Sequence, residues 1–326
     1  MKMLMVSVAL TLLCTAAAVA TMGESASCVA TFSIVGFDPQ TGELGIAVAS
    51  KFLAVGAVVP WAKAGVGAVA TQAWANTTYG PQGLELLSSG VGAHEAVDKL
   101  VAGDEDRERR QVGMVDASGG SATFTGKECI SWASGKAGKY FACQGNILVS
   151  EETITAMAES FRNSTGELAL RLVNALKAGE EAGGDSRGKQ SAALLVVKEG
   201  GGYLGLNDRY IDLRVDDHPE PIDELSRLLS IQLAYSALFK AGALNKEGDL
   251  EGAVREAERA AELNPDIPEV LYDLACYYSL AGNTERALAT LDRALSLAPE
   301  FKKMASEDPD LKPLRAEEAF KTMVGE

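Results

Sequence analysis

A 34-residue repeat near the C-terminal end limits most strongly what this chain can fold into. Glycine, alanine, leucine and proline recur at that offset in five pairs: Gly248/Gly282, Ala253/Ala287, Ala260/Ala294, Leu263/Leu297 and Pro265/Pro299. The alanines suit places where two helices approach closely, and each proline ends the second helix of a unit. A repeat of this length therefore predicts stacked pairs of helices in the last third of the chain.

This pattern resembles the tetratricopeptide repeat, a helix-turn-helix unit of the same length. Two units are fewer than stack stably alone, so we expect capping by the preceding helix and by the tail Asp308–Arg315, or support from the first domain. The resemblance implies a groove that binds a protein partner or peptide. The alternative is an appendage that stabilises the chain or forms a dimer.

Composition excludes several classes of function. The chain has 326 residues, 47% of them hydrophobic and 23% charged, which is typical of a soluble protein of about two domains. A net charge of −15 disfavours nucleic acid or an anionic membrane as a partner. His94, His218 and the scattered cysteines show no zinc-type spacing, and phosphate- and dinucleotide-binding glycine motifs are missing, so we expect no metal and no cofactor.

The first 30 residues have the pattern of an export signal. Lys2 precedes an apolar run over 3–20, which ends in a small-residue cleavage site at Ala18–Ala20. A second small-residue site, Cys28–Ala30, lies directly before Thr31. We therefore expect an extracytoplasmic protein, periplasmic or secreted. Cleavage at the second site exposes Thr31, whereas cleavage at the first leaves a short pro-segment.

Thr31 begins an apolar stretch, 31–38, that predicts a first strand. If the chain is cut before Thr31, this residue carries a hydroxyl nucleophile and an α-amine base together. An α-amine has a pKa of about 7.7–8.0, so part of it is unprotonated near neutral pH. The alternative is an ordinary strand threonine. The stretch 31–38 and the strand expected at 43–50 would form a hairpin, with Lys51 at the end of its second strand. Lys51 would either lower the pKa of the α-amine and of the hydroxyl of Thr31 or be a solvated strand-end lysine.

The remaining pattern predicts an α+β domain followed by helices. Strands are expected at 43–50, at two places within 55–75, and at 111–117, 122–125, 139–149, 190–198, 202–205 and 210–215; helices are expected at 80–102, broken near Gly90 and Gly92, and at 151–162, 166–178 and 222–241. Short strand connections favour antiparallel sheets with helices outside, either as a four-layer αββα sandwich or as a two-layer α+β domain.

Several motifs in this region resemble one family in their order: Thr31-Phe-Ser-Ile-Val, Glu43-Leu-Gly-Ile-Ala-Val-Ala-Ser-Lys-Phe, Ala68-Val-Ala-Thr-Gln-Ala, Gln144-Gly-Asn-Ile-Leu, Gly183-Gly-Asp-Ser-Arg-Gly-Lys-Gln-Ser-Ala-Ala-Leu and Asp212-Leu-Arg-Val-Asp-Asp-His-Pro. The family is domain-of-unknown-function family 1028, which belongs to the N-terminal-nucleophile (Ntn) hydrolase-like folds. The resemblance covers about 31–229 and implies the αββα sandwich, with no established substrate.

The same resemblance implies roles for individual residues. Thr31 matches the class's nucleophile and Lys51 its basic residue at the end of strand two. Asn146, ahead of Asn76, is the candidate oxyanion donor, because Gly145 beside it lets backbone approach a ligand. Asp185, Arg187 and Ser191 lie in a glycine-rich loop that resembles the one orienting the N-terminal amine. A surface Asp–Arg pair of little energetic weight is the alternative.

The sequence thus predicts a leader over 1–30, an Ntn-hydrolase-like domain over 31–215, a linker and connecting helix over 216–236, and repeats with a capping tail over 237–326. The predicted function is hydrolysis of an amide bond in a small-molecule or peptide substrate, with a protein partner on the repeats. A catalytically inactive scaffold of the cell envelope is the alternative, and homo-oligomerisation is left open. Cys129 and Cys143 bracket an expected hairpin over 130–142 and would form a disulfide, or else pack as two small core residues.

Overall fold

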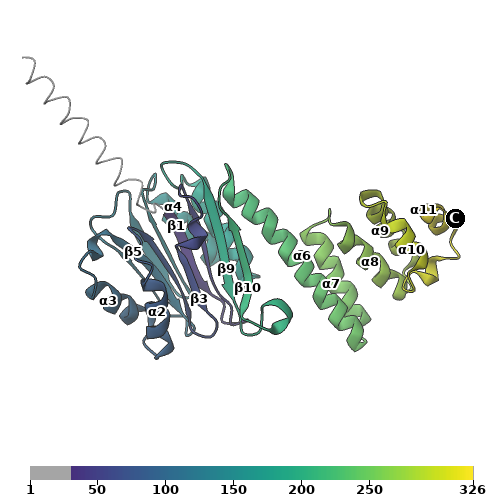
Figure 1. Cartoon of the computed structure of the whole chain (residues 1–326), viewed down its shortest axis with the longest axis horizontal. Coiled ribbons are helices and arrows are strands. Elements are labelled where there is room, and N and C mark those ends of the chain that lie inside the picture. The colour runs from purple at the N-terminus through teal and green to yellow at the C-terminus, as the bar shows by residue number, and fades with distance from the viewer. Residues whose placement is uncertain (1–30, 326) are drawn as a thin grey trace, which may run out of the picture. The chain divides into compact units, whose positions relative to one another are not determined.

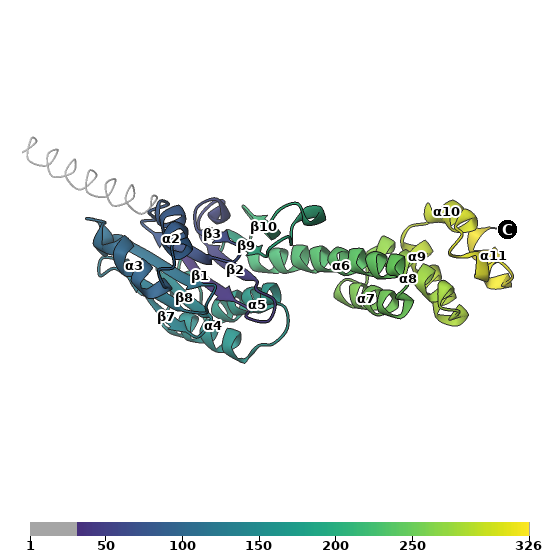
Figure 2. The same cartoon turned by 90° about the horizontal axis from the view of Figure 1, so that it is seen from below.

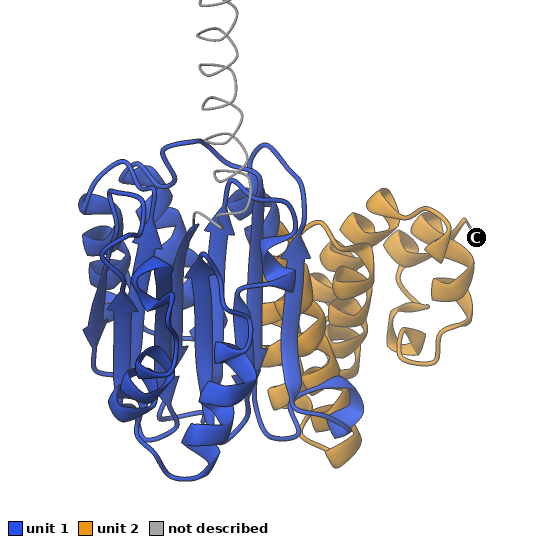
Figure 3. Ribbon diagram, turned by 60° about the vertical axis from the view of Figure 1, so that its left-hand side comes forward, with its two compact units in different colours: residues 1–226 blue, residues 227–326 orange. Residues whose placement is uncertain are grey.

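The computed structural model describes residues 31–325, in two compact units. The units divide between Ser226 and Arg227, within helix α6 (Pro221–Glu247), and are shown in blue and orange in Figure 3. The predicted leader and both predicted cleavage sites lie outside the described residues. None of the helices within 31–325 has the length and apolar character needed to span a membrane.

The larger sheet of the first unit has six antiparallel strands. Their order is β10 (Arg209–Val215), β9 (Ser191–Val197), β2 (Leu44–Ser50), β1 (Thr31–Phe37), β8 (Phe141–Asn146) and β7 (Ser134–Gly138). Strand β1 lies near the centre and every residue of it is buried. The first strand within residues 31–325 therefore occupies the interior of the unit.

The second sheet has four antiparallel strands. They run in the order β3 (Pro60–Lys63), β4 (Gly67–Ala73), β5 (Arg110–Asp116) and β6 (Ser121–Thr125). Strands β1 and β8 contact β4 and β5 across the interface between the two sheets. The interface is apolar over most of its area because Val35, Ile46, Ala68 and Val115 point into it from the two sheets.

Helices cover the outer face of each sheet and complete four layers. Helices α2 (Tyr79–Ser88) and α3 (Ala93–Ala102) pack on the smaller sheet, and α4 (Glu152–Asn163) and α5 (Leu168–Glu181) pack on the larger one. Figures 1 and 2 show the two helical layers with the sheets between them. The unit is an αββα sandwich, as the resemblance implied, rather than a two-layer domain.

Two paired glycines explain how closely α5 approaches the larger sheet. Gly36 of β1 and Gly45 of β2 are register partners. A Cβ atom at these positions would lie 3.0 and 2.7 Å from side-chain atoms of Leu172 in α5. Distances that short are not tolerated without movement, so glycine here allows the helix to pack directly on the strands.

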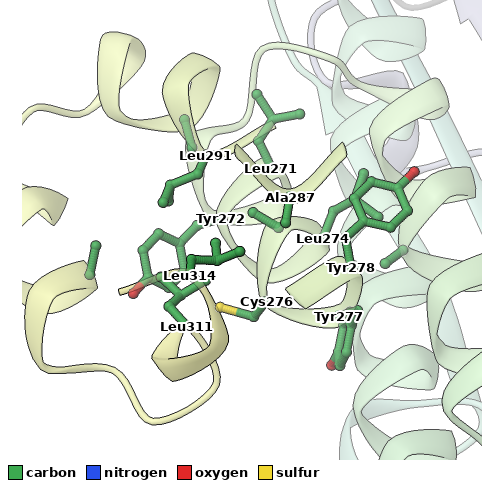
Figure 4. Packing of buried hydrophobic residues seen from close by; sticks show 14 of the residues in the cluster. Leu271, Tyr272, Leu274, Cys276, Tyr277, Tyr278, Ala287, Leu291, Leu311 and Leu314 are labelled. Atoms are coloured by element: carbon green, nitrogen blue, oxygen red, sulfur yellow. The ribbon is translucent and has the colours of Figure 1, made fainter. Parts of the chain in front are cut away.

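The second unit is helical throughout and contains the 34-residue repeat. After α6 come α7 (Leu250–Leu263), α8 (Pro268–Leu280), α9 (Thr284–Leu297), α10 (Phe301–Glu307) and α11 (Glu318–Val324). Asp249 and Asn283, also 34 residues apart, each cap the N-terminus of the next helix with a side-chain oxygen. Leu271, Leu274 and Ala287 belong to the core between the helices (Figure 4).

Two sequence predictions for the first unit were wrong. Residues 202–205 form a short 3-10 turn instead of a strand, because Gly200, Leu204 and Gly205 all have positive φ. Cys129 and Cys143 are not joined by a disulfide among the described residues. Cys143 is buried in β8, whereas the Cys129 thiol donates to the Arg110 carbonyl at 3.3 Å. The hairpin expected between the two cysteines is present as β7 and β8.

Candidate functional site

A row of polar side chains crosses four adjacent strands at one end of the larger sheet. Thr31 of β1 pairs with Ser50 of β2 on one side and with Asn146 of β8 on the other, and Ser50 pairs with Ser191 of β9. All four are at most 2% exposed. The Thr31 hydroxyl donates to Ser50 Oγ at 3.2 Å. Partners in register point to the same face of a sheet, so these side chains share the inner face.

A layer of buried glutamines lies beside this row, between the two sheets. Gln72 of β4 and Gln111 of β5 are register partners, and Gln144 of β8 faces them from the other sheet. Gln72 Nε2 donates to the Thr31 carbonyl at 3.2 Å and to Gln111 Oε1 at 2.8 Å. Asn146 Nδ2 donates to the same Gln111 oxygen at 3.0 Å. The row is thus hydrogen-bonded to the opposite sheet.

Two backbone carbonyls determine which atoms donate and which accept in the hydrogen bonds of Gln111. Gln111 Nε2 lies 2.8 Å from the Gly145 carbonyl and 3.1 Å from the Ser134 carbonyl. Carbonyl oxygens only accept, so the Gln111 atom facing them is nitrogen and its oxygen faces the other way. Gln72 and Asn146 must therefore present their nitrogens to that oxygen. The amide orientation of Asn146 is fixed by the fold.

Two acceptors of this layer have no donor among residues 31–325: Gln144 Oε1 and Asn146 Oδ1. The amide nitrogen of Gln144, in contrast to its oxygen, has a partner: Gln144 Nε2 donates to Ser33 Oγ at 2.6 Å. Ser33 Oγ in turn donates to Gln72 Oε1 at 2.5 Å. Buried acceptors without a donor are costly, and in native proteins they mark a place for water or a ligand group. One of the two, Asn146 Oδ1, belongs to the register partner of Thr31.

The glycine-rich loop before β9 holds the end of β2. The Asp185 carboxylate accepts from the Lys51 backbone N–H at 3.0 Å, and from Arg187 Nε and Nη2 at 3.1 and 2.9 Å. The exposed Lys51 ammonium donates to the Lys189 carbonyl at 3.1 Å. Asp185 and Arg187 thus form an ion pair, and Asp185 is buried rather than on the surface. The loop contacts the end of the polar row through the backbone of Lys51.

Ser191 has a role in the backbone geometry after β2. Its hydroxyl donates to the Phe52 carbonyl and accepts from the Val55 N–H at 3.2 Å. Thr31, Asn146 and Ser191 are therefore brought into one row, whereas Asp185, Arg187 and Lys51 form a neighbouring cluster. Asn76 belongs to neither group, because its Nδ2 donates to Asp104 Oδ2 at 3.0 Å.

Asp104 lies in a cleft of about 690 Å³ that α2 and α3 help to form. Burial by itself would raise the pKa of the Asp104 carboxyl, but hydrogen bonds from Asn76, Arg110, the Asp106 N–H and Tyr79 together lower it to about 2. Burial, followed by the Asp104 carboxylate, raises the pKa of the Tyr79 hydroxyl. These shifts favour an ionised Asp104 carboxylate and a neutral Tyr79 hydroxyl at neutral pH, so this cluster is suited to structure rather than acid–base catalysis.

The glutamines are the residues that sequence reasoning missed. Gln111 was read only as part of a strand, although it joins both sheets. The available signal was a glutamine at an inner position of an otherwise apolar strand, because a buried polar residue in a sheet needs partners. No cluster of three or more His, Cys, Asp or Glu side chains able to hold a metal occurs within residues 31–325.

Comparisons with known proteins agree with this division of the chain. The model of a family of unknown function, DUF1028, matches residues 31–225, and a tetratricopeptide repeat model matches residues 244–317. A crystal structure from Silicibacter pomeroyi, titled as a DUF1028 protein, has a TM-score of 0.56 and 34% sequence identity. The similarity covers 61% of this chain and 84% of that one. No curated protein matches the chain.

Proposed function

This chain belongs to the DUF1028 family, with tetratricopeptide-like repeats after the family domain, and on that premise we propose that it is an N-terminal-nucleophile hydrolase of amide bonds. The proposal includes export by the leader, cleavage of the chain before Thr31, and binding of a protein partner by the repeats. It names Thr31 as the nucleophile and a small-molecule or peptide amide as the substrate class.

The polar row at the end of β1 is the observation that carries the proposal. A hydroxyl residue is the first of the strand, and its register partners, Ser50 and Asn146, are both polar and buried. Apart from this row and the glutamine layer beside it, the interface between the sheets is apolar, so polar groups gathered around one hydroxyl are expensive and favour a function. Asn146 Oδ1 is a buried acceptor beside this residue and would suit a donor such as an α-ammonium group.

In the proposed reaction, cleavage before Thr31 first releases its α-amine. The Thr31 hydroxyl then attacks the acyl carbon of the substrate, and the α-amine takes the hydroxyl proton. The amine passes this proton to the leaving nitrogen as the carbon–nitrogen bond breaks, which leaves an ester on Thr31. Water attacks that ester with the same amine as base, so the acid product leaves and the threonine is restored.

The neighbouring residues have supporting roles in this scheme. Asn146 Nδ2 uses one N–H on Gln111, and its second N–H is the candidate donor to the oxyanion. Asp185, held by Arg187, fixes the Lys51 backbone beside the row, and Ser191 fixes the chain after β2. Lys51 would contribute through its charge, which is a weak effect for an exposed side chain.

A second function, a catalytically inactive binding module, is favoured by a specific observation. The Lys51 ammonium is exposed and hydrogen-bonded to the Lys189 carbonyl, and the Arg187 guanidinium is paired with Asp185. The Lys51 ammonium, which would increase the reactivity of Thr31, therefore has another partner, and the nearby Arg187 is held by Asp185. In this alternative the first unit is a scaffold, and the repeats perform the binding.

Covalent labelling separates the two functions. The protein would be exported with its own leader, and its N-terminus determined by mass spectrometry. It would then be treated with a β-lactone probe that acylates activated hydroxyls. The hydrolase proposal predicts one label, on Thr31, and none in Thr31→Ala.

Thr322→Ala is the matched control, because it makes the same chemical change at an exposed position of α11. It should label as wild type does. Label that persists in Thr31→Ala would move the nucleophile to Ser33 or Ser191. A correctly processed protein that takes no label would favour the binding module.

A further inference from the structure

A groove in the second unit lies between helices α6 and α8. It has a volume of about 340 Å³ and is lined from α6 by Tyr235, Leu238, Phe239, Gly242, Ala243 and Lys246, and from α8 by Asp273 and Tyr277. The α6 residues recur at intervals of three and four, so they form one continuous face of that helix. The groove is a feature of a single compact unit.

Three of the side chains that line the groove are aromatic, and one of these three faces solvent. Phe239 is 75% exposed, the highest value among the exposed large hydrophobic side chains of the second unit. An isolated exposed apolar residue needs no explanation, but here Phe239 shares the groove with Tyr235 and Tyr277. Exposed aromatic side chains beside a groove are typical of the centres of protein-binding sites.

Gly242 keeps the groove open. A Cβ atom at this position would lie 3.7 Å from the Tyr277 hydroxyl, which is an ordinary contact distance. A larger side chain there would therefore extend into the groove without a clash at its first carbon. Glycine is unfavourable in the middle of a helix, so its presence here costs stability while leaving space.

Asp273 gives the groove a negative charge that nothing in the described chain neutralises. Its carboxylate has no hydrogen-bond or ion-pair partner among residues 31–325. Burial, followed by the carboxylates of Asp308, Asp310 and Glu269, raises its pKa to about 6. The one cation of the groove lining, Lys246, is exposed at its rim. A partly buried carboxylate among like charges favours a cationic ligand group.

We propose that this groove binds a peptide segment of a partner protein in which an arginine or lysine lies near an apolar side chain. The basic group pairs with Asp273 and stacks on the tyrosine rings, and the apolar side chain packs on Phe239. This inference rests on, and makes specific, the partner-binding part of the proposed function. A volume of about 340 Å³ accommodates a few side chains rather than a large ligand.

Peptide selection on the full chain tests the proposal. A phage-displayed library of random peptides would be selected on the wild-type protein, and the enriched peptides synthesised and measured by fluorescence anisotropy. We expect the enriched sequences to share a basic and an apolar residue. Asp273→Asn should weaken their binding at least tenfold, because a charge-assisted hydrogen bond is lost. Gly242→Leu should abolish binding by filling the groove.

Two controls make the result specific. Leu297→Ala truncates an exposed apolar side chain of α9 outside the groove and should leave binding unchanged. Thr31→Ala should also leave it unchanged, so failure of the hydrolase proposal does not affect this test. Circular dichroism would confirm that each variant is folded.

Several results would overturn the proposal. These are an enriched consensus that is acidic or wholly apolar, affinity that survives Gly242→Leu, and a library that yields no enriched sequence. Light scattering tests a further outcome: if Gly242→Leu changes the oligomeric state, the groove holds a second copy of the chain, which also contradicts a peptide partner.

Discussion

Replacing Gly113 by alanine should break the hydrogen-bonded layer between the sheets. Gly113 lies on the inner face of β5, opposite Gln144 of β8. A Cβ atom at Gly113 would be 1.9 Å from Gln144 Oε1 and 2.3 Å from its Cδ, so the glutamine side chain must move. Its hydrogen bond to Ser33, which is 2.6 Å long, would be lost.

The expected cost combines two effects. Overpacking a tightly packed interior costs about 1–3 kcal/mol. A buried donor left without an acceptor costs about 1–3 kcal/mol more. We therefore expect Gly113→Ala to lower the free energy of unfolding by roughly 2–6 kcal/mol, a large part of the ~5–15 kcal/mol available to a domain.

Urea unfolding followed by tryptophan fluorescence measures this effect in the correct unit, because Trp61, Trp74 and Trp132 all lie in the first unit. Gly103→Ala is the control, since a Cβ atom there would meet only carbonyl oxygens at 3.7 and 3.8 Å. The double variant Gly113→Ala/Gln144→Ala should be at least about 1 kcal/mol more stable than the sum of the single effects. A loss below about 1 kcal/mol for Gly113→Ala, or strict additivity, would refute the reasoning.

Three further predictions concern the second unit and a buried thiol. The pKa of Asp273 is raised to about 6 in the folded chain, so ionisation of this carboxyl makes folding less favourable as the pH rises from about 4 to 6. Asp273→Asn should therefore stabilise the second unit at pH 7 by up to roughly 3 kcal/mol. Thermal unfolding curves should show no such stabilisation below about pH 4. Asp249→Ala and Asn283→Ala each remove a helix cap and should each cost about 1 kcal/mol in chemical denaturation, and equal stability to wild type would contradict the assigned caps. Burial raises the pKa of the Cys143 thiol, so mass spectrometry should find this residue alkylated by iodoacetamide only after unfolding.

Local sequence signals predicted most elements of the fold. The break between α2 and α3 was predicted from Gly90, which has positive φ, and the repeat was predicted from its spacing. A hairpin was expected between Cys129 and Cys143, but no bounds were predicted for its first strand, β7, because Ser134–Gly138 contains four small residues and a lysine with little strand preference. Its structure comes from pairing with β8, a long-range contact that composition does not show.

The candidate site was predictable only in part. Thr31 and Asn146 were chosen from separate motifs, and their register pairing brings them together. Gln111 was not chosen, because its role depends on the two sheets facing each other. The orientation of the Lys51 side chain toward Lys189 was equally inaccessible, since both residues belong to loops whose path depends on tertiary packing. Position along a strand is a local property, whereas apposition of two sheets is not.

The first residue of the mature chain tests the central claim most directly. The protein would be expressed with its own leader in a bacterial host, recovered from the extracytoplasmic fraction, and its N-terminal peptide sequenced by mass spectrometry. Our account predicts a chain that begins at Thr31 with a free amine. A chain that begins at Phe32, or that keeps Ala30 joined to Thr31, would contradict it, because the proposed base would not exist.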